Sequence, residues 1–177
     1  MSALPTINKY WTLFLDRDGV INKRLVGDYV KSVDEFEFLD GSLDAIRQFS
    51  DIFGVVVILT NQQGIGRGLM TKADLNSIHA SMLDQIKKHG GRIDHVFYCP
   101  ELAADNPECR KPNTGMGLEA KAMFPQIDFK KSLMVGDSIS DMEFGEGLGT
   151  QCAFIGSDER YLSFDSLIHV ARSITSK

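Results

Sequence analysis

The stretch from Trp11 to Val20 reads Trp-Thr-Leu-Phe-Leu-Asp-Arg-Asp-Gly-Val, and the rest of the chain is organised around it. A short apolar run ends in two aspartates, Asp16 and Asp18, and a glycine follows, which is typical of a buried strand that delivers carboxylates to its own carboxyl end. Open α/β sheets bind their ligands at that end. Two carboxylates in one crevice suit either a hard divalent cation or the paired roles of nucleophile and acid/base. A solvated turn is the alternative, and this stretch alone leaves both open.

Strand and helix patterns alternate along the rest of the chain. Apolar runs predict four further strands, at 55–59, 93–98, 132–137 and 151–155. Helical spacing and end signals predict helices over 41–49, from Thr71 to a stop at Gly90, over 117–124, 138–148 and 162–174. This order predicts an α/β fold with a doubly wound, mainly parallel five-stranded sheet, in a single domain over residues 1–177. Residues 22–38 have no helical period, so we expect a short flap there, beside the end of the first strand.

Composition indicates a small-molecule partner. A chain of 177 residues that is 43% hydrophobic has enough apolar residues for one core. A net charge of -5 gives no basic footprint for nucleic acid or for an anionic membrane, and no apolar run has the length of a membrane span. The first ten residues lack a signal-peptide pattern, so we expect a cytoplasmic protein. We also expect a monomer. Three cysteines are an odd number and are expected to be reduced thiols: Cys99, Cys109 and Cys152.

Polar side chains follow several of the predicted strands and are expected to share one crevice, where they suit phosphate transfer. Asp16 is the expected nucleophile, and Asp18 is placed to protonate the leaving group and then to deprotonate water. Lys111 and Thr60 would stabilise the phosphoryl oxygens. Magnesium, held by acidic oxygens near Asp16 and Asp137, would offset repulsion between the nucleophile and a phosphate dianion.

Four motifs occur in a fixed order, and together they resemble those of the haloacid dehalogenase superfamily of phosphatases. They are Asp-x-Asp-Gly-Val from Asp16, Leu-Thr-Asn ending at Asn61, Arg-Lys-Pro from Arg110, and Val-Gly-Asp-x-x-x-Asp ending at Asp141. The resemblance implies a phospho-aspartyl intermediate on Asp16 and magnesium bound by the Asp16 carboxylate, the Asp18 backbone carbonyl and Asp137. Asp141 would either support the metal site from behind its direct ligands, which we favour, or stabilise the start of its helix.

Within that superfamily, four segments resemble the histidinol-phosphatase-like branch: Asp16–Asn22, Gly27–Val30, Thr60–Ile65 and Cys99–Pro112. Members of the branch include D-glycero-D-manno-heptose 1,7-bisphosphate 7-phosphatases and histidinol-phosphate phosphatases. The resemblance implies removal of the 7-phosphate from a heptose 1,7-bisphosphate, with histidinol phosphate or another sugar or polyol phosphate as the alternative. It also implies substrate contacts from Tyr29, Asn61, Gln62, Gln63 and Arg110. The intervals between the motifs are too short for a cap domain, so loops would choose the substrate.

The loop at 99–113 departs from the branch, which often carries a zinc site of the form Cys-x-His…Cys-x-Cys. The matching positions here are Cys99, Glu101, Pro107 and Cys109, so two of the four ligands are missing. A tetrahedral structural zinc needs all four. We therefore expect magnesium as the cofactor and no structural zinc.

Two other classes of function compete with a phosphatase. Receiver-like phospho-acceptor domains also combine a strand-end aspartate with acidic neighbours, a threonine and a lysine, and a non-catalytic binding module is a third reading. Asp18 provides an acid/base two residues from the nucleophile, which favours turnover over a long-lived acyl phosphate. Arg17, between the two aspartates, is expected to point away from the crevice and is given no role.

Overall fold

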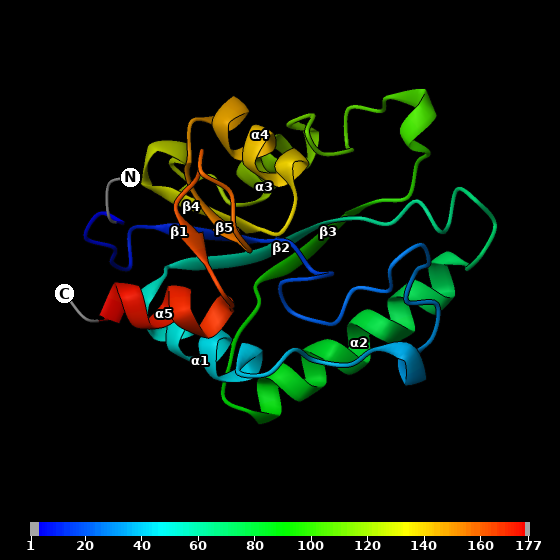
Figure 1. Cartoon of the computed structure of the whole chain (residues 1–177), viewed down its shortest axis with the longest axis horizontal. Helices are drawn as coiled ribbons and strands as arrows, with labels where there is room; N and C mark the ends of the chain where they lie inside the picture. Colours follow the sequence, from blue (N-terminus) through cyan, green and yellow to red (C-terminus); the bar gives the residue numbers. More distant parts are fainter. Residues whose placement is uncertain (1–3, 176–177) are drawn as a thin grey trace.

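A six-stranded parallel sheet forms the middle layer of the molecule (Figure 1). The computed structural model describes residues 4–175. The strands are β1 (Thr12–Leu15), β2 (Val55–Asn61), β3 (His95–Cys99), β4 (Ser132–Gly136), β5 (Gln151–Ile155) and β6 (Ser163–Phe164). They lie in the order β3-β2-β1-β4-β5-β6, and every neighbouring pair is parallel. The predicted doubly wound α/β fold is confirmed.

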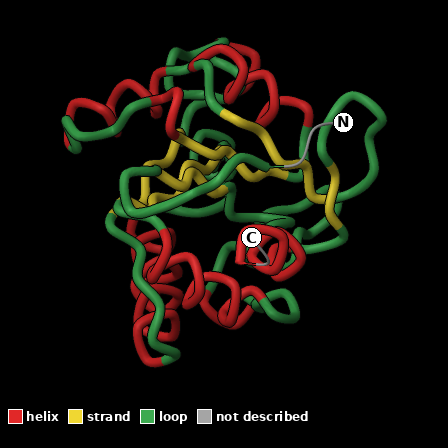
Figure 2. The backbone as a smooth tube through the Cα atoms, turned by 90° about the vertical axis from the view of Figure 1, so that its left-hand side faces the viewer, coloured by secondary structure: helices red, strands yellow, loops and turns green. Residues whose placement is uncertain are grey.

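Helices cover both faces of the sheet (Figure 2). One face packs against α1 (Ser42–Ile52), α2 (Lys72–Lys88) and α5 (Leu167–Thr175). The other face packs against α3 (Gly115–Met123) and α4 (Ile139–Leu148). Short 3-10 turns lie at Val33–Glu35, Ala103–Asp105 and Phe129–Lys131. Among residues 4–175, no helix combines the length and the apolar character needed to cross a membrane.

The sheet has one strand more than the five that were predicted. Ser163 and Phe164 pair in parallel with Phe154 and Ile155 at the edge of the sheet, and the closing helix begins only at Leu167. The prediction that this helix begins at 162 was wrong, because a two-residue edge strand leaves no periodic pattern of its own. Its pairing partners are supplied by β5, which no local pattern can reveal.

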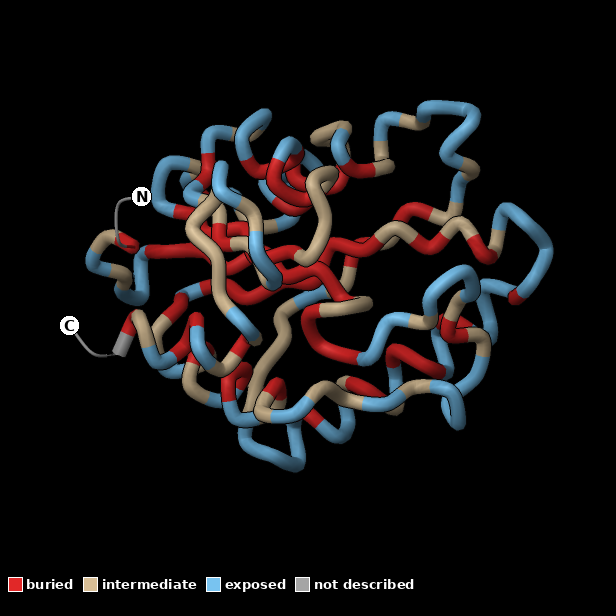
Figure 3. The backbone as a smooth tube through the Cα atoms, in the orientation of Figure 1, coloured by how far each residue is buried: buried red, intermediate tan, exposed pale blue. Residues whose placement is uncertain are grey.

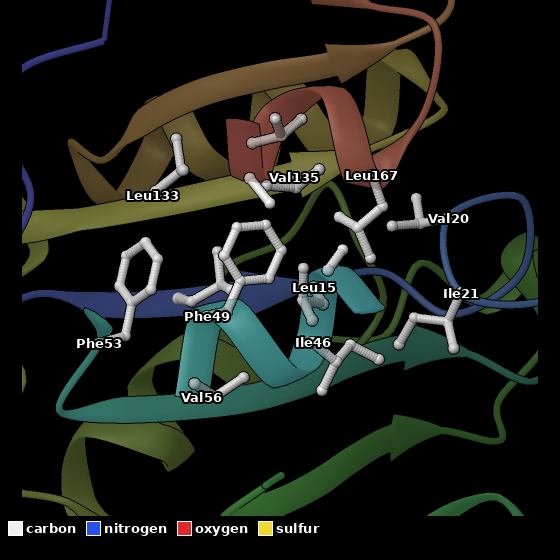
Figure 4. Packing of buried hydrophobic residues seen from close by; sticks show 14 of the residues in the cluster. Leu15, Val20, Ile21, Ile46, Phe49, Phe53, Val56, Leu133, Val135 and Leu167 are labelled. Carbon is white, nitrogen blue, oxygen red and sulfur yellow. The ribbon is translucent and has the colours of Figure 1, made fainter. Parts of the chain in front are cut away.

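The apolar residues of β1 are buried on both faces, as expected for a central parallel strand (Figure 3). Successive side chains of a strand point to opposite faces, so Phe14 packs with the α3 and α4 layer, whereas Leu13 and Leu15 pack with α1 and α5. Figure 4 shows Phe49 of α1 lying against the sheet close to Leu15 and Val135. The strand that leads into Asp16 and Asp18 is thereby held rigidly from two sides.

The order of the strands creates a crevice at the end of β1. The chain runs outward from β1 to β2 and β3, and then crosses back to β4 and β5 on the other side of β1. The connections after β1 and β4 therefore leave the sheet in opposite directions, and a ligand crevice opens between them. Asp16 follows β1 directly and Asp137 follows β4, so the two lie side by side at this point.

The segment 22–38 forms the expected flap above this crevice. Asn22 and Phe38 form an isolated antiparallel bridge, and Lys23 N donates to Glu37 O, so the two ends of the flap are held together at its base. Val30 is buried, which anchors the middle of the segment. Between these points the flap is irregular, apart from the turn at Val33–Glu35.

Replacing Phe49 by alanine should lower the free energy of unfolding by about 3–5 kcal/mol, because the ring is fully buried and its loss leaves a cavity under β1. Urea denaturation measures the change. Asp51→Ala on the exposed side of the same helix is the control and should shift stability by less than about 0.5 kcal/mol. Equal losses in the two variants would contradict the packing described here.

Candidate active site

A buried lysine between two carboxylates forms the centre of the site. Lys111 Nζ donates to Asp16 Oδ1 at 2.6 Å and to the carbonyl of Leu59 at 2.6 Å, and it lies 2.6 Å from Asp141 Oδ1. All three charged side chains are nearly inaccessible to solvent. Burial raises the pKa of Asp16 to about 7, with Asp141 and Asp18 adding to the rise and Lys111 opposing it. The pKa of Lys111 is also raised, because the attraction of Asp141 and Asp16 outweighs the cost of burying its charge.

Asp137 completes an acidic cluster that fits a divalent cation. Oxygens of Asp16, Asp137 and Asp141 lie within 4.8 Å of one another. Burial, followed by the charge of Asp141, raises the pKa of Asp137, because negative charge is disfavoured in a buried acidic cluster and a nearby cation would favour it. Hard carboxylate oxygens in this number suit magnesium. Arg24 of the flap also reaches Asp137, at 3.3 Å.

Asp141 stabilises the start of its helix and also lies in the acidic cluster. Its carboxylate accepts hydrogen bonds from the backbone N–H and the hydroxyl of Ser138 at the start of α4, so it stabilises that end of the helix. The same carboxylate pairs with Lys111 and lies beside Asp16 and Asp137. Its position thus links the helix to the candidate metal ligands.

Asp18 lies at the edge of the cavity and is held by several donors. Arg17 Nη2 lies 2.9 Å from each carboxylate oxygen of Asp18, and the amides of Asn22 and Gln62 donate to one oxygen each, at 2.9 and 2.8 Å. Burial alone would raise the pKa of Asp18, but Arg17 and the two amides hold it below its usual value. Arg17 itself is absent from the cavity lining, and its guanidinium contacts the Asp18 carboxylate from behind, a contact that the sequence did not predict.

The side chains at the end of β2 and in the turn after it, Thr60 to Gln63, have different partners. Thr60 is buried and lines the cavity. The Asn61 side chain donates to Lys111 O and accepts from Lys111 N, both at 3.1 Å, which fixes the lysine's backbone. Gln62 is buried, and its amide donates to Asp18 and to Thr60 Oγ1. It is absent from the cavity lining, whereas Gln63 is part of it, so the structure separates two residues that the sequence had grouped as substrate contacts.

The loop 99–113 carries a disulfide between Cys99 and Cys109. The expectation of three reduced thiols was therefore wrong for this pair, and only Cys152 is free within residues 4–175. The bond joins the end of β3 to the residue before Arg110. The two cysteines that remain of the four-ligand pattern are thus close enough to bond to each other, which sequence spacing cannot establish.

Basic and aromatic side chains form a further part of the cavity lining, here called the distal wall. It consists of Tyr29, Gln63, Arg67 and Arg110, and the whole cavity holds about 390 Å³. The Arg67 guanidinium lies 5.7 Å from the Tyr29 ring, and Gln63 donates to the Tyr29 hydroxyl at 2.7 Å. Arg110 Nη1 is buried without a hydrogen-bond partner among the described residues. Burial, together with the charge of Arg67, lowers the pKa of Arg110.

The sequence had identified three of the four distal residues and missed Arg67, and it also missed Arg24 of the flap. Arg24 lies inside the flap segment, and Arg67 lies inside the glycine-rich turn at 64–68, shortly after Gln63. A basic residue close in sequence to residues that are expected in the crevice is the signal that was available for both. The importance of these two arginines becomes clear only in the tertiary structure, where the flap and the turn line the same cavity.

Together these groups can transfer a phosphoryl group. A buried nucleophile, a lysine and a hydroxyl surround one end of the cavity, an acid/base candidate lies two residues from the nucleophile, and three carboxylates fit a magnesium ion. On this fold, such a site defines a phosphatase of the haloacid dehalogenase superfamily. The family described as polynucleotide kinase 3 phosphatase matches residues 13–158, and the chain belongs to it.

Curated relatives and a solved structure agree with this assignment. D-glycero-alpha-D-manno-heptose-1,7-bisphosphate 7-phosphatase of Mycobacterium tuberculosis is 40% identical over 138 residues, which is 78% of this chain and 73% of that protein. D-glycero-beta-D-manno-heptose-1,7-bisphosphate 7-phosphatase of Pseudomonas putida is 37% identical over 92% of this chain and 98% of its own. The D,D-heptose 1,7-bisphosphate phosphatase of B. bronchiseptica, crystallised with magnesium and phosphate, superposes with a TM-score of 0.85. It is 32% identical, and the match covers 94% of this chain and 98% of that one.

Gly19→Ala should weaken magnesium binding by about tenfold or more. Gly19 has a φ of +92°, and a Cβ placed there would collide with the Asp137 carboxylate. Displacing a residue that holds a metal ligand typically costs 10- to 100-fold in affinity. Calorimetric titration with magnesium in the absence of substrate measures the effect.

Gly149→Ala is the matched control for this variant. Gly149 also has a left-handed backbone, with a φ of +80°, but a Cβ there meets open space. Both variants should lose about 1–2 kcal/mol of stability from the backbone conformation. Only Gly19→Ala should lose magnesium affinity, and an equal affinity in the two variants would show that Gly19 does not protect the position of Asp137.

Proposed function

We propose that this phosphatase removes the 7-phosphate of D-glycero-D-manno-heptose 1,7-bisphosphate. The observation that carries the proposal is that one cavity is lined by two groups of side chains suited to phosphate. One group is Asp16, Lys111 and Thr60, and the other is Arg67 and Arg110 of the distal wall. The named relatives and the solved neighbour, which are heptose bisphosphate phosphatases, support the same choice.

The distal arginines favour a substrate with a second negative group. Arg110 Nη1 has no partner among the described residues, and the like charge of Arg67 is near enough to lower the pKa of Arg110. Both features cost free energy in the free enzyme, and an anion bound between the two guanidinium groups would relieve them. A second phosphate at the far end of the substrate supplies this anion.

Histidinol phosphate fits this wall less well than a bisphosphate does. The end of histidinol that lies away from its phosphate carries an ammonium group and an imidazole, which is neutral or cationic near neutral pH. Arg67 and Arg110 would repel the ammonium group and leave their own donors without acceptors. The cavity chemistry therefore ranks histidinol phosphate below the bisphosphate.

The residues divide two half-reactions between them. An Asp16 oxygen attacks phosphorus, the bond from phosphorus to the sugar oxygen breaks, and Asp18 gives its proton to the leaving alkoxide. A phosphate dianion beside Asp18 favours its protonated form, because a like charge disfavours the carboxylate. Water then attacks the phospho-aspartyl phosphorus, its proton passes to Asp18, and inorganic phosphate leaves with Asp16 restored. Lys111 and Thr60 interact with the phosphoryl oxygens.

Magnesium fits the acidic cluster described above. Asp16, Asp137 and the backbone carbonyl of Asp18 would hold it, with Asp141 supporting them from behind. When bound, it supplies positive charge that offsets the repulsion between the carboxylates and the phosphate dianion. Lys111 alone does not supply enough positive charge to offset this repulsion.

Asp16→Asn should abolish turnover, with a loss of about 10⁴-fold or more, and leave the fold intact, because the amide keeps the size of the side chain but removes the nucleophile. Phosphate release and a thermal melt check both parts. In acid-quenched reactions the wild-type enzyme should gain the mass of one phosphoryl group and the variant should not. Asp51→Asn on the surface of α1 is the control, and turnover by a folded Asp16→Asn protein would contradict the mechanism.

Arg110→Ala should raise KM for the heptose 1,7-bisphosphate by about 10- to 100-fold, since a hydrogen bond to a charged group contributes roughly 1.5–3 kcal/mol. KM for heptose 7-phosphate, which lacks the distal phosphate, should change less than about threefold. Arg47→Ala, on the exposed side of α1, is the control.

A panel of phosphate esters tests the choice of substrate. It includes both anomers of the bisphosphate, histidinol phosphate and a 3′-phosphorylated oligonucleotide. We expect the bisphosphate to have the highest kcat/KM and the oligonucleotide to release no phosphate. A higher kcat/KM for histidinol phosphate or for the oligonucleotide would overturn the assignment of substrate while leaving the phosphatase chemistry in place.

A further inference from the structure

The Asp18 carboxylate is surrounded by donors from three segments of the chain. Arg17 comes from the end of β1, Asn22 from the start of the flap, and Gln62 from the turn after β2. Oδ1 accepts from Arg17 and Asn22, and Oδ2 accepts from Arg17 and Gln62. The carboxylate is therefore fixed about both of its side-chain torsions.

Arg17 is itself wholly buried, on the opposite side of β1 from Asp16. The alternation of strand side chains directs Asp16 into the crevice and Arg17 toward α2. There its Nη1 lies 3.1 Å from His79 Nε2, and its guanidinium lies 6.0 Å from the Phe36 ring. An arginine can only donate, so His79 Nε2 accepts and the imidazole is neutral. Burial, with the charge of Arg17, lowers the pKa of His79 to about 3, in agreement with a neutral ring.

The orientation of the Asn22 and Gln62 side-chain amides toward Asp18 leaves their own oxygens without hydrogen bonds to the described residues. Asn22 Oδ1 and Gln62 Oε1 are both buried without a hydrogen-bond partner among residues 4–175. An unsatisfied buried acceptor costs about 1–3 kcal/mol. The amides keep this orientation because their NH2 groups are directed at the Asp18 carboxylate, which is the strongest acceptor within their reach.

We propose that Arg17, held from behind by His79, acts with Gln62 to position Asp18 for proton transfer to the leaving group. Arg17 and Gln62 are positioning residues and do not touch the substrate: both are buried, and neither lines the cavity. A general acid must lie within hydrogen-bond reach of the oxygen that it protonates, so the direction of the Asp18 carboxyl decides its efficiency. The proposal rests on the phosphatase mechanism above and assigns Gln62 to positioning in place of substrate binding.

Aryl phosphates test this separately from the choice of sugar substrate. Phenyl phosphate and p-nitrophenyl phosphate are similar in size, but nitrophenolate is a stable anion that leaves with little help from an acid. The value of kcat/KM reports the steps up to release of the phenol, and so it isolates the half-reaction in which Asp18 gives its proton. Loss of positioning should therefore slow phenyl phosphate much more than p-nitrophenyl phosphate.

Arg17→Lys and Arg17→Met should lower kcat/KM for phenyl phosphate by about 10- to 100-fold, a part of the 10²- to 10⁴-fold that general acid catalysis contributes. For p-nitrophenyl phosphate the loss should be less than about threefold. Gln62→Met should likewise slow phenyl phosphate more than p-nitrophenyl phosphate, with KM for either ester nearly unchanged. Equal losses for the two esters in these variants would overturn the proposal.

His79 offers a gentler test if the Arg17 variants do not fold. In His79→Gln the side-chain oxygen can still accept a hydrogen bond from Arg17, whereas His79→Leu removes the acceptor. The ratio of kcat/KM for the two esters should therefore be closer to the wild-type ratio in His79→Gln than in His79→Leu. Phe49→Ala is the control for a general loss of stability and should leave the ratio at its wild-type value. An identical ratio in His79→Gln and His79→Leu would contradict the part assigned to His79.

The outcome for this proposal is separate from the outcome for the sugar substrate. If the wild-type enzyme hydrolyses both aryl phosphates but no heptose bisphosphate, the substrate assignment fails and the ester ratio still measures the positioning of Asp18. If the bisphosphate is hydrolysed and the Arg17 variants slow both esters alike, the positioning proposal alone fails.

Discussion

The pairing of Lys111 with Asp16 and Asp141 is the interaction on which the site depends. Two buried carboxylates so close together would repel each other strongly in a poorly hydrated crevice, and the lysine at 2.6 Å from both keeps them in place. The arrangement requires three separate parts of the chain to meet. β1 supplies Asp16, α4 supplies Asp141, and the loop held by Asn61 supplies Lys111. The negative charge that remains is what makes the same cluster suitable for a divalent cation.

Because successive side chains along β1 point to opposite faces of the sheet, the residues after this strand contact different parts of the molecule. Asp16 faces the crevice, while Arg17 faces the layer of α2, where His79 and Phe36 enclose it. Asp18 lies after the strand and is reached from both sides, because it lines the cavity and accepts from Arg17. One strand end therefore supplies the proposed nucleophile, the proposed acid/base and the arginine that contacts the acid/base.

Charge is distributed locally in a way that the composition does not reveal. The chain has a net charge of -5, yet the distal wall of the cavity is basic, with Arg67 and Arg110 close enough to influence each other. The acidic residues and the arginines line one cavity of about 390 Å³. A small substrate with two phosphates fits this distribution of charge, whereas the net charge argues only against large polyanions.

The sequence by itself determined the alternation of strands and helices, the doubly wound sheet and the candidate catalytic residues, because these depend on local patterns. An apolar run followed by Asp16 and Asp18 indicates a strand that ends in carboxylates. Only the tertiary structure decided the sixth strand, the bond between Cys99 and Cys109, and the contacts of Arg17 and Gln62 with Asp18. Each of these depends on partners far away in the chain, and the direction in which a side chain points is set by the elements that pack around it.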